Sequence, residues 1–358
     1  MNTNIPLATH HGIFRQQISL FQAVALIVSG TVGAGILGIP YAIAQVGWLP
    51  GFFSIVLIGL LMMGVNLLIA RIVIGTNQQL HFVGLANRYL GAVGKYLMSV
   101  IMYGMLFGIL VVYILGVGES LAALFGWDPR LWSTVFFLLG AICILFGLRT
   151  IKSVEFFLSL GILCVVLIIS ATLVPSIETT HFGFVSLHNV LVPYGVLLFA
   201  FHGATSLPEV YSLVQNKEKF FIEAVKVSSV IVIAIYALFT FVVLGVTGPY
   251  TTEIATVGLG QAIGPVMLVL GNIFAVLAMG TSYLVAGLAL RDSLTWDMNM
   301  SRPLATAAVT CIPYLIFLFF ATSFVGMIDL VGGVFMTSEI VLLLIIYVVA
   351  KRRGDVHG

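Results

Sequence analysis

Residues 29–40 read SGTVGAGILGIP, and this short run decides the fold. It lies inside an apolar stretch, 18–45, that is long enough to cross a bilayer. The run holds Gly30, Gly33, Gly35 and Gly38 and ends in Pro40, and each glycine costs a helix roughly 1 kcal/mol relative to alanine. Close helix packing explains single small residues but not the whole cluster. Because unpaired backbone inside a bilayer is tolerated only where protein or a wet cavity surrounds it, the run predicts a broken membrane helix.

The composition of the whole chain is that of an integral membrane protein. Of its 358 residues, 61% are hydrophobic and only 8% are charged, with a mean hydropathy of +1.18, whereas a soluble domain carries about 25% charged residues. Soluble enzymes, nucleic-acid-binding proteins and disordered chains are therefore excluded. The apolar stretches lack the alternation of barrel strands, so we expect an all-α bundle that forms a single transmembrane domain over 1–358. Ten spans are expected: 18–45, 48–72, 93–118, 131–149, 153–174, 187–214, 222–247, 261–290, 303–323 and 327–350.

The distribution of Lys and Arg predicts the orientation of these spans. With the N-terminus in the cytoplasm, every basic residue except Arg130 falls on the cytoplasmic side. The cytoplasmic set is Arg15, Arg71, Arg88, Lys95, Arg149, Lys152, Lys217, Lys219, Lys226, Arg291, Arg302, Lys351, Arg352 and Arg353. Losing or adding one central span would scatter these residues over both sides. The sequence therefore predicts a multi-pass protein of the cell membrane with ten spans and both termini in the cytoplasm.

A second broken stretch lies at the matching place in the second half of the chain. Residues 199–209, FAFHGATSLPE, again combine a glycine, small polar residues and a proline within an apolar span. Both breaks fall in the first span of a five-span half, as an inverted repeat of about 18–174 and about 187–350 would place them. Paired interruptions of this kind indicate the midplane binding site of a secondary transporter. The freed N–H groups suit a carboxylate, and the freed carbonyls suit an ammonium group or a cation.

Three segments carry a family resemblance. They are 30–40, 193–209 with its PYGVLLFAF start, and 281–292 with its TSYL start and terminal Arg291-Asp292. These segments resemble the first, sixth and eighth spans of the amino acid/polyamine/organocation superfamily. Within it, the chain is similar to the aromatic and hydroxy amino acid permeases and to the amino acid/auxin permeases. The resemblance covers nearly the whole chain and implies the LeuT-type fold, a 5+5 inverted repeat with spans 1 and 6 broken. His202 departs from the pattern, where a small residue or serine is expected.

The resemblance also implies a substrate site at the two breaks. The carboxylate of an amino acid would meet the first break, and its amino group would meet carbonyls of the second. Tyr103 of span 3 would face this site, unless it is an ordinary core tyrosine. No Lys or Arg lies in the middle of a span, which favours a neutral substrate, aromatic or otherwise hydrophobic. The implied substrate residues at the breaks are Thr31, Val32, Gly33, Ala34, Gly35, Phe201, His202, Gly203 and Thr205.

Sodium is one candidate coupling ion. Thr281 and Ser282 are adjacent hydroxyls deep in span 8. In the LeuT-type fold, such a pair binds sodium together with carbonyls of span 1, here near Val32. The alternative is that both hydroxyls bond to carbonyls of their own helix.

The proton is the other candidate. His202, Glu209 and Glu339 are ionisable groups within spans, where such groups are costly and usually functional. Glu339 lies twelve residues before Lys351, so about 18 Å from the inner edge of the membrane. Each has a structural alternative. His202 would only shape the pocket, Glu209 would cap a helix or pair with a lysine, and Glu339 would bond a buried backbone group while protonated.

The resulting hypothesis is a secondary active transporter that imports a neutral amino acid by symport with H⁺ or Na⁺. Alternating access would come from rocking spans 1, 2, 6 and 7 against spans 3, 4, 8 and 9. The resemblance to aromatic amino acid permeases favours protons, and the hydroxyl pair leaves sodium open. The alternative is an amino-acid-sensing receptor subunit on the same fold. We expect no enzyme, organic cofactor, other metal site or nucleic-acid partner, since no span holds paired aspartates or an HExxH motif. The expected partners are the amino acid and the lipid bilayer.

Overall fold

A computed structural model describes residues 19–76, 80–146, 161, 164–214, 217–321 and 323–356, without the side chains of residues 209, 296 and 297. Helices and turns account for all regular structure in these ranges. The helices are α1 (Leu20–Thr31), α2 (Gly35–Ala44), α3 (Trp48–Thr76), α4 (Phe82–Phe125), α5 (Pro129–Phe146), α7 (Pro193–Ala200), α8 (Leu207–Leu213), α9 (Glu218–Thr247), α10 (Ala255–Ile263), α11 (Pro265–Asp297), α12 (Arg302–Phe319), α13 (Phe324–Leu330) and α14 (Thr337–Arg352).

Every expected span is matched by helical structure. Seven helices are long and apolar enough to cross a membrane, and α1 with α2 forms an eighth span that is bent by 61°. The broken pair α7 and α8 lies on expected span 6, and a shorter apolar helix, Cys164–Ser176, lies on the end of span 5. Residues 153–160 of span 5 fall outside the described ranges. The predicted all-α membrane fold is confirmed.

Several span boundaries differ from the sequence-based expectation. Expected span 3 began at residue 93, but α4 begins at Phe82 and changes direction at Gly91, whose φ is 69°. Expected span 8 began at residue 261, but those residues end α10. Gly264 (φ 130°) turns the chain there, and Pro265 starts α11, because glycine tolerates positive φ and proline suits a first helical turn. Residues 187–192 of expected span 6 form a short 3₁₀ turn and a loop.

Span 10 contains a feature that the sequence analysis did not predict. A single π-helical segment, η6 (Val331–Met336), joins α13 to α14. Such segments occur frequently at functional sites, since the extra residue shifts the register of the side chains that follow. Glu339 lies in the first turn after this segment.

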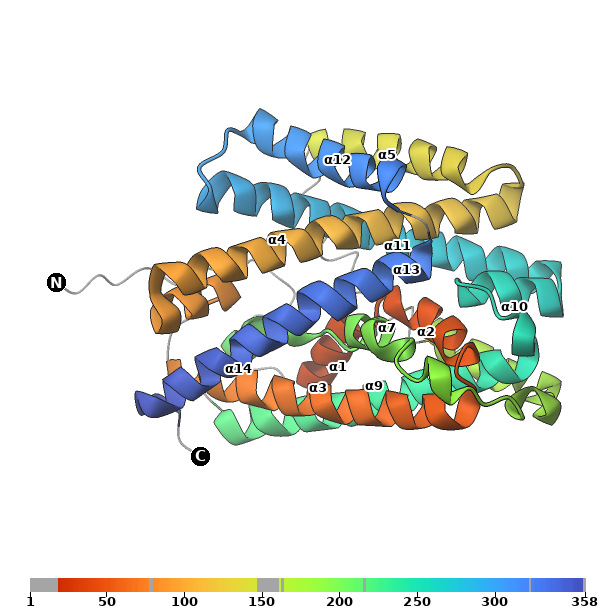
Figure 1. The fold of residues 1–358 in the computed structure, drawn as a ribbon, viewed down its shortest axis with the longest axis horizontal. Coiled ribbons are helices and arrows are strands. Elements are labelled where there is room, and N and C mark those ends of the chain that lie inside the picture. The colour runs from red at the N-terminus through yellow and green to blue at the C-terminus, as the bar shows by residue number, and fades with distance from the viewer. Residues whose placement is uncertain are drawn as a thin grey trace.

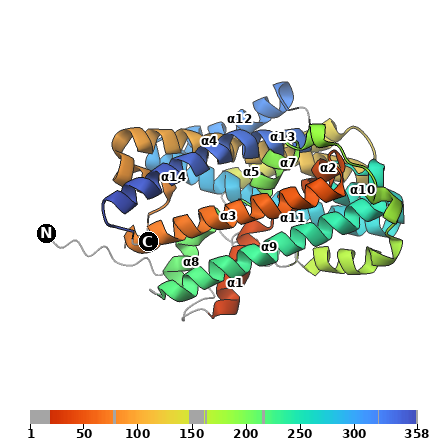
Figure 2. The same ribbon diagram turned by 60° about the horizontal axis from the view of Figure 1, so that its bottom comes forward.

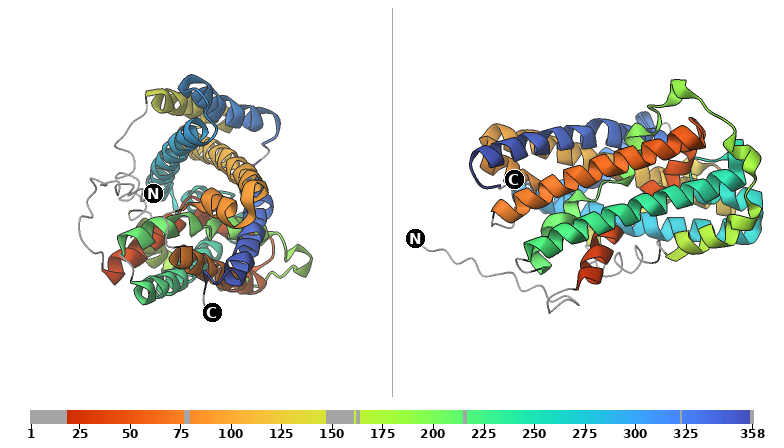
Figure 3. Two further views of the ribbon diagram at one scale, coloured as in Figure 1. Left: turned by 90° about the vertical axis from the view of Figure 1, so that its left-hand side faces the viewer. Right: turned by 90° about the horizontal axis from the view of Figure 1, so that it is seen from below.

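The spans form two groups (Figure 1). Helices α4, α5, α11 and α12 pack together in what we call the α4 group, and α1, α2, α3, α7, α8 and α9 pack together in the α3 group. The end-on view of Figure 3 separates the same groups, with α13 and α14 alongside both. The division matches the two sets of spans that the sequence analysis expects to rock against each other.

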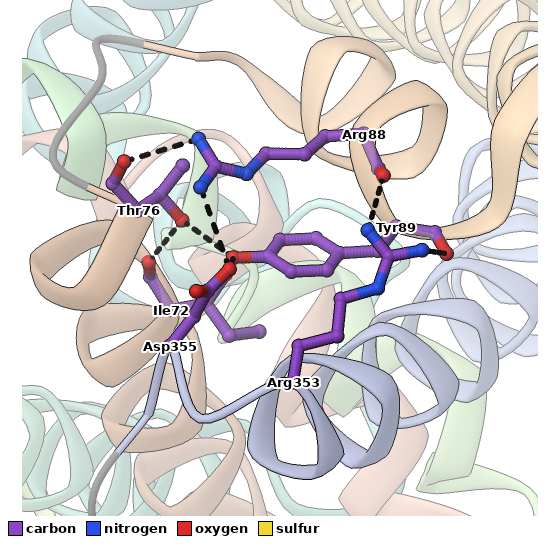
Figure 4. A network of polar contacts seen from close by, with 6 residues as sticks. All are labelled: Ile72, Thr76, Arg88, Tyr89, Arg353 and Asp355. Carbon is purple, nitrogen blue, oxygen red and sulfur yellow. Dashed lines mark hydrogen bonds and ion pairs between the residues drawn. The ribbon is translucent and has the colours of Figure 1, made fainter.

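A polar network ties the C-terminal segment to the ends of α3 and α4 (Figure 4). The Asp355 carboxylate accepts a hydrogen bond from the Tyr89 hydroxyl at 2.9 Å and pairs with Arg88 at 3.4 Å. The Arg353 guanidinium donates to the carbonyls of Arg88 and Tyr89 at 3.0 and 3.2 Å. The chain approaches α3 closely, because a Cβ on Gly75 would collide with the Asp355 carbonyl. This network links α3 of one group to α4 of the other.

Candidate functional site

The first break is the gap between α1 and α2. A capping box starts α1, in which Ser19 and Gln22 bond reciprocally at 3.2 and 2.8 Å. Helix α1 ends at Thr31, since Val32 has an extended backbone (φ −79°, ψ 101°). The Val32 side chain is fully buried. Helix α2 starts at Gly35 without a capping side chain. Within the described chain, no acceptor receives the backbone N–H groups of residues 33–35. The break thus presents free N–H donors, as the sequence predicts.

The second break is the gap between α7 and α8. Residues 201–203 leave the helix, and a 3₁₀ turn at Ala204–Ser206 leads into α8. The Phe201 side chain is 4% exposed and packs on Tyr236 with ring centroids 4.8 Å apart. Thr205 is exposed.

The two breaks lie against each other, and glycines make this contact possible. A Cβ on Gly203 would collide with the Thr31 side chain, and one on Gly35 would lie 2.9 Å from the Cα of Ala200. Gly33, in contrast, faces open space, with no described atom within 4 Å of an added Cβ. Space and free N–H donors therefore coincide at Gly33, where the sequence analysis expects the substrate carboxylate. Figure 2 shows α1 diverging from the bundle on the other side of this break.

Tyr236 of α9 joins the two breaks and was missed by the sequence analysis. Its hydroxyl donates to the carbonyl of Ala200 at 2.7 Å and contacts the carbonyl of Thr31 at 3.3 Å. The side chain is fully buried. A tyrosine in the middle of an apolar span signals a buried hydroxyl that needs a partner, although the sequence does not reveal which partner.

Two of the ionisable candidates for proton coupling meet in the structure. His202 Nε2 lies 3.2 and 3.3 Å from the two carboxylate oxygens of Glu339. Their side chains are 8% and 1% exposed, so the pair is shielded from solvent. Each residue is a candidate from the sequence alone, but the contact between them could not be predicted from it.

The position of Glu339 depends on close packing between α7 and the π-helical segment. A Cβ on Gly332 would collide with the carbonyl of Gly195, and one on Gly195 would collide with Asp329. The Tyr194 and Thr337 hydroxyls are also hydrogen bonded at 3.0 Å. Backbone therefore packs directly on backbone along α7, which fixes α14 relative to the second break.

The other sequence-predicted residues lie on α4, α8 and α11. The Thr281 hydroxyl bonds to the carbonyls of Leu277 and Ala278 in its own helix, at 3.0 and 3.1 Å, and Ser282 is half-buried beside it. Helix α11 packs on α4, α5, α10 and α12, whereas α1 packs on α8 and α9. The sodium site at Val32, Thr281 and Ser282 stays a prediction, with the Thr281 hydroxyl bonded to its own helix. The Tyr103 hydroxyl bonds to Ser293 of α11 at 3.1 Å, as a core tyrosine would. The side chain of Glu209 lies outside the described residues.

Comparison with known proteins places this geometry in a family. The family model for the transmembrane amino acid transporter protein matches residues 16–347. Curated relatives include glutamine transporter 2 of Aliivibrio fischeri, 26% identical over 93% of this chain and 90% of the relative. Amino acid transporter AVT3B of Arabidopsis thaliana is 25% identical over 71% of this chain and 66% of its own length. Tyrosine-specific transport system 1 of Haemophilus influenzae is 24% identical over 88% and 85%.

Solved structures match in fold. The structure of MhsT in complex with L-phenylalanine superposes with a TM-score of 0.64 at 16% identity, covering 92% of this chain and 89% of that one. The closed conformation of Mhp1, a nucleobase-cation-symport-1 family transporter with bromovinylhydantoin bound, gives 0.58 at 14% identity, covering 90% and 78%. The LeuT-type fold that the family resemblance implies is thereby confirmed. The chain belongs to the transmembrane amino acid transporter family and is a multi-pass amino acid transporter with the LeuT-type fold.

Proposed function

We propose that this transporter is a proton-coupled symporter, which carries a neutral, aromatic or otherwise hydrophobic amino acid into the cytoplasm by alternating access. The observation that carries the proposal is the buried contact between His202 and Glu339. His202 belongs to a broken span of the α3 group, and Glu339 belongs to α14, which runs alongside both groups. The charge of the pair therefore lies at the boundary between the α3 group and α14, which we expect to move relative to each other during transport.

The burial of the pair makes its proton count matter. With one shared proton the pair has no net charge, either as imidazole with carboxylic acid or as imidazolium with carboxylate. A second proton leaves a net charge of +1 in a site that solvent does not reach, which is costly. An arrangement that exposes the pair to water removes this cost, so it is the arrangement in which the second proton binds. Such a pair can load a proton from one side and release it to the other.

The substrate is proposed to lie at the first break. Its carboxylate would accept hydrogen bonds from the free N–H groups of residues 33–35, where the α2 dipole favours negative charge. Gly33→Leu should fill this open space and abolish binding while the protein stays folded. Binding at wild-type affinity in that variant would place the substrate elsewhere.

Separate measurement of accumulation and exchange tests the coupling proposal. Proteoliposomes would receive the wild type, Glu339→Gln or His202→Gln, with pH and sodium gradients imposed one at a time. We expect both variants to lose accumulation driven by a pH gradient and to retain exchange of labelled for unlabelled substrate. The double variant Thr281→Ala with Ser282→Ala is the matched control and should keep both activities.

Two results would overturn the coupling proposal. Strict sodium dependence, together with lost sodium-stimulated binding in the Thr281/Ser282 variant, would move coupling to spans 1 and 8. Amino acid binding without either accumulation or exchange would instead support the receptor alternative.

We propose that the protein lies in the cell membrane with both termini in the cytoplasm. The described basic ends of α3, α4, α9, α11, α12 and α14 lie at one end of the bundle, and the start of α5, which carries Arg130 in its sequence, lies at the other (Figure 1). Reporter fusions after each loop test this arrangement. A C-terminus on the outer side would contradict it.

A further inference from the structure

A small polar pocket lies beside the first break, where α1, α3 and α9 meet. Its volume is about 10 Å³, which is close to the roughly 10–15 Å³ that a cavity needs to hold one water molecule. Helix α9 packs on both α1 and α3 (Figure 2). The polar side chains that line the pocket are Thr31 of α1, Asn66 of α3, and Ser228 and Ser229 of α9. We call it the Asn66 pocket.

Asn66 brings an unpartnered oxygen to this pocket. It lies within the apolar helix α3 and is only 6% exposed. Its Oδ1 atom is buried, and no described residue donates a hydrogen bond to it. Buried side-chain oxygens are normally hydrogen bonded. Because Asn66 lines the pocket, the donor that this oxygen requires is an occupant of the pocket.

The other three polar side chains also present lone pairs. The Thr31 hydroxyl donates to the carbonyl of Ile27 at 2.8 Å. The Ser228 and Ser229 hydroxyls donate to the carbonyl of Val225, at 3.0 and 2.8 Å. A hydroxyl has one proton and two lone pairs, so each of these oxygens can still accept a hydrogen bond but has no proton left to donate. The pocket therefore selects an occupant that donates hydrogen bonds.

Size and charge identify that donor. A pocket of about 10 Å³ holds one very small molecule and excludes an amino acid. No Asp or Glu is among the described residues that line it, so a cation would bring an unbalanced charge into a buried site, which is costly. A water molecule has two protons to donate and no charge. We propose that one ordered water occupies the Asn66 pocket, and that Asn66, through this water, positions the end of α1.

The end of α1 matters because both breaks contact it. Thr31 is the last residue of α1, and a Cβ on Gly203 of the second break would collide with its side chain. The Thr31 carbonyl also lies 3.3 Å from the Tyr236 hydroxyl. A water that donates to both Asn66 and Thr31 ties α3 to this point. The consequence for substrate binding rests on the proposed transport site, whose free N–H groups follow shortly after Thr31 in the chain.

Radiolytic oxidation of methionine tests for the water directly. X-ray irradiation of the protein in H₂¹⁸O produces hydroxyl radicals from ordered water, and these radicals oxidise the side chains beside it. Met62 lines the pocket and is only 1% exposed, whereas Met98 and Met279 are fully buried and do not line it. We expect Met62 to gain ¹⁸O several-fold faster than Met98 and Met279, with the exposed Met298 reporting the radical dose.

Two variants connect the water to Asn66 and to substrate binding. Asn66→Leu has a side chain of similar size without the oxygen, and it should lower the oxidation rate of Met62 to that of Met98. It should also raise the Kd of the transported amino acid by about 2- to 10-fold, which corresponds to one hydrogen bond. Thr240→Val is the matched control. It removes a buried, unpartnered hydroxyl of α9 that does not line the pocket, so it should change neither value.

The results that overturn this proposal differ from those that overturn the transport proposal. Oxidation of wild-type Met62 at the rate of Met98 would exclude the water, and this measurement needs neither a variant nor a substrate. Fast oxidation of Met62 in choline chloride that stops in sodium chloride would assign the pocket to a cation instead. Unchanged affinity in Asn66→Leu, while Gly33→Leu abolishes binding, would refute the positioning role. Wild-type affinity of Gly33→Leu would refute the proposed transport site and the positioning role with it, but not the water.

Discussion

Tyr236→Phe should weaken substrate binding, because it removes the hydroxyl that joins the two breaks. The hydroxyl serves the carbonyl of Ala200 at 2.7 Å and lies 3.3 Å from that of Thr31, and the tyrosine is fully buried. Leaving a buried acceptor without its donor costs about 1–3 kcal/mol. If substrate binding requires the joined arrangement, that loss raises the dissociation constant by roughly 5- to 150-fold. The short bond to Ala200 accounts for most of the effect, because a hydrogen bond weakens with length.

The assay compares this variant with Tyr283→Phe. Tyr283 is equally buried, but no described residue bonds to its hydroxyl, so its removal leaves no carbonyl unsatisfied. Substrate affinity and thermal unfolding would be measured for both in nanodiscs. We expect weaker binding and a lower unfolding temperature for Tyr236→Phe, and wild-type values or slight stabilisation for Tyr283→Phe. Equal effects of the two substitutions, or unchanged affinity in Tyr236→Phe, would refute the role assigned to the hydroxyl.

Three further substitutions follow from the contacts. Gly203→Ala should abolish uptake, because its Cβ would collide with Thr31, whereas Gly33→Ala adds a Cβ in open space and should keep uptake. Uptake is measured at equal expression, and higher uptake by Gly203→Ala than by Gly33→Ala would contradict the packing. Gly332→Ala should lower the unfolding temperature because its Cβ would collide with α7, and an unchanged value would mean that α7 and the π-helical segment separate easily. Asp355→Asn should speed amide hydrogen exchange at the start of α4 (Figure 4). It should change the free energy of unfolding by only about 0–1 kcal/mol, since the Arg88–Asp355 ion pair is partly exposed. Unchanged exchange would show that the network does not hold α4.

Much of the fold can be predicted from the sequence because the bilayer imposes length and composition on each span. The first break is a clear case, since the glycine cluster at 29–40 cannot form a continuous lipid-exposed helix. The second break follows from Gly203 and Pro208, and the structure places it against the first. Boundaries near Gly91 and Gly264 were harder, because the positive φ of a glycine cannot be read from the sequence.

Contacts between distant spans could not be predicted in the same way. Glu339 was singled out by its cost inside the membrane, but its partner depends on the π-helical segment, whose sequence, VGGVFM, has no periodic signature. The hydrogen bond of the Thr281 hydroxyl to its own helix was one of two alternatives that the sequence left open, and sodium binding there stays a prediction. Tyr236 was not singled out, since a single tyrosine in an apolar span is ordinary on its own.

Substrate-evoked proton movement tests the central proposal most directly. Proteoliposomes that contain a trapped pH-sensitive dye, with no sodium on either side and no imposed gradient, would receive the transported amino acid outside. Proton coupling through His202 and Glu339 predicts that the lumen acidifies as substrate enters with the wild type, and that acidification disappears in Glu339→Gln. Entry of the amino acid without acidification, or entry only after sodium is added, would contradict the account.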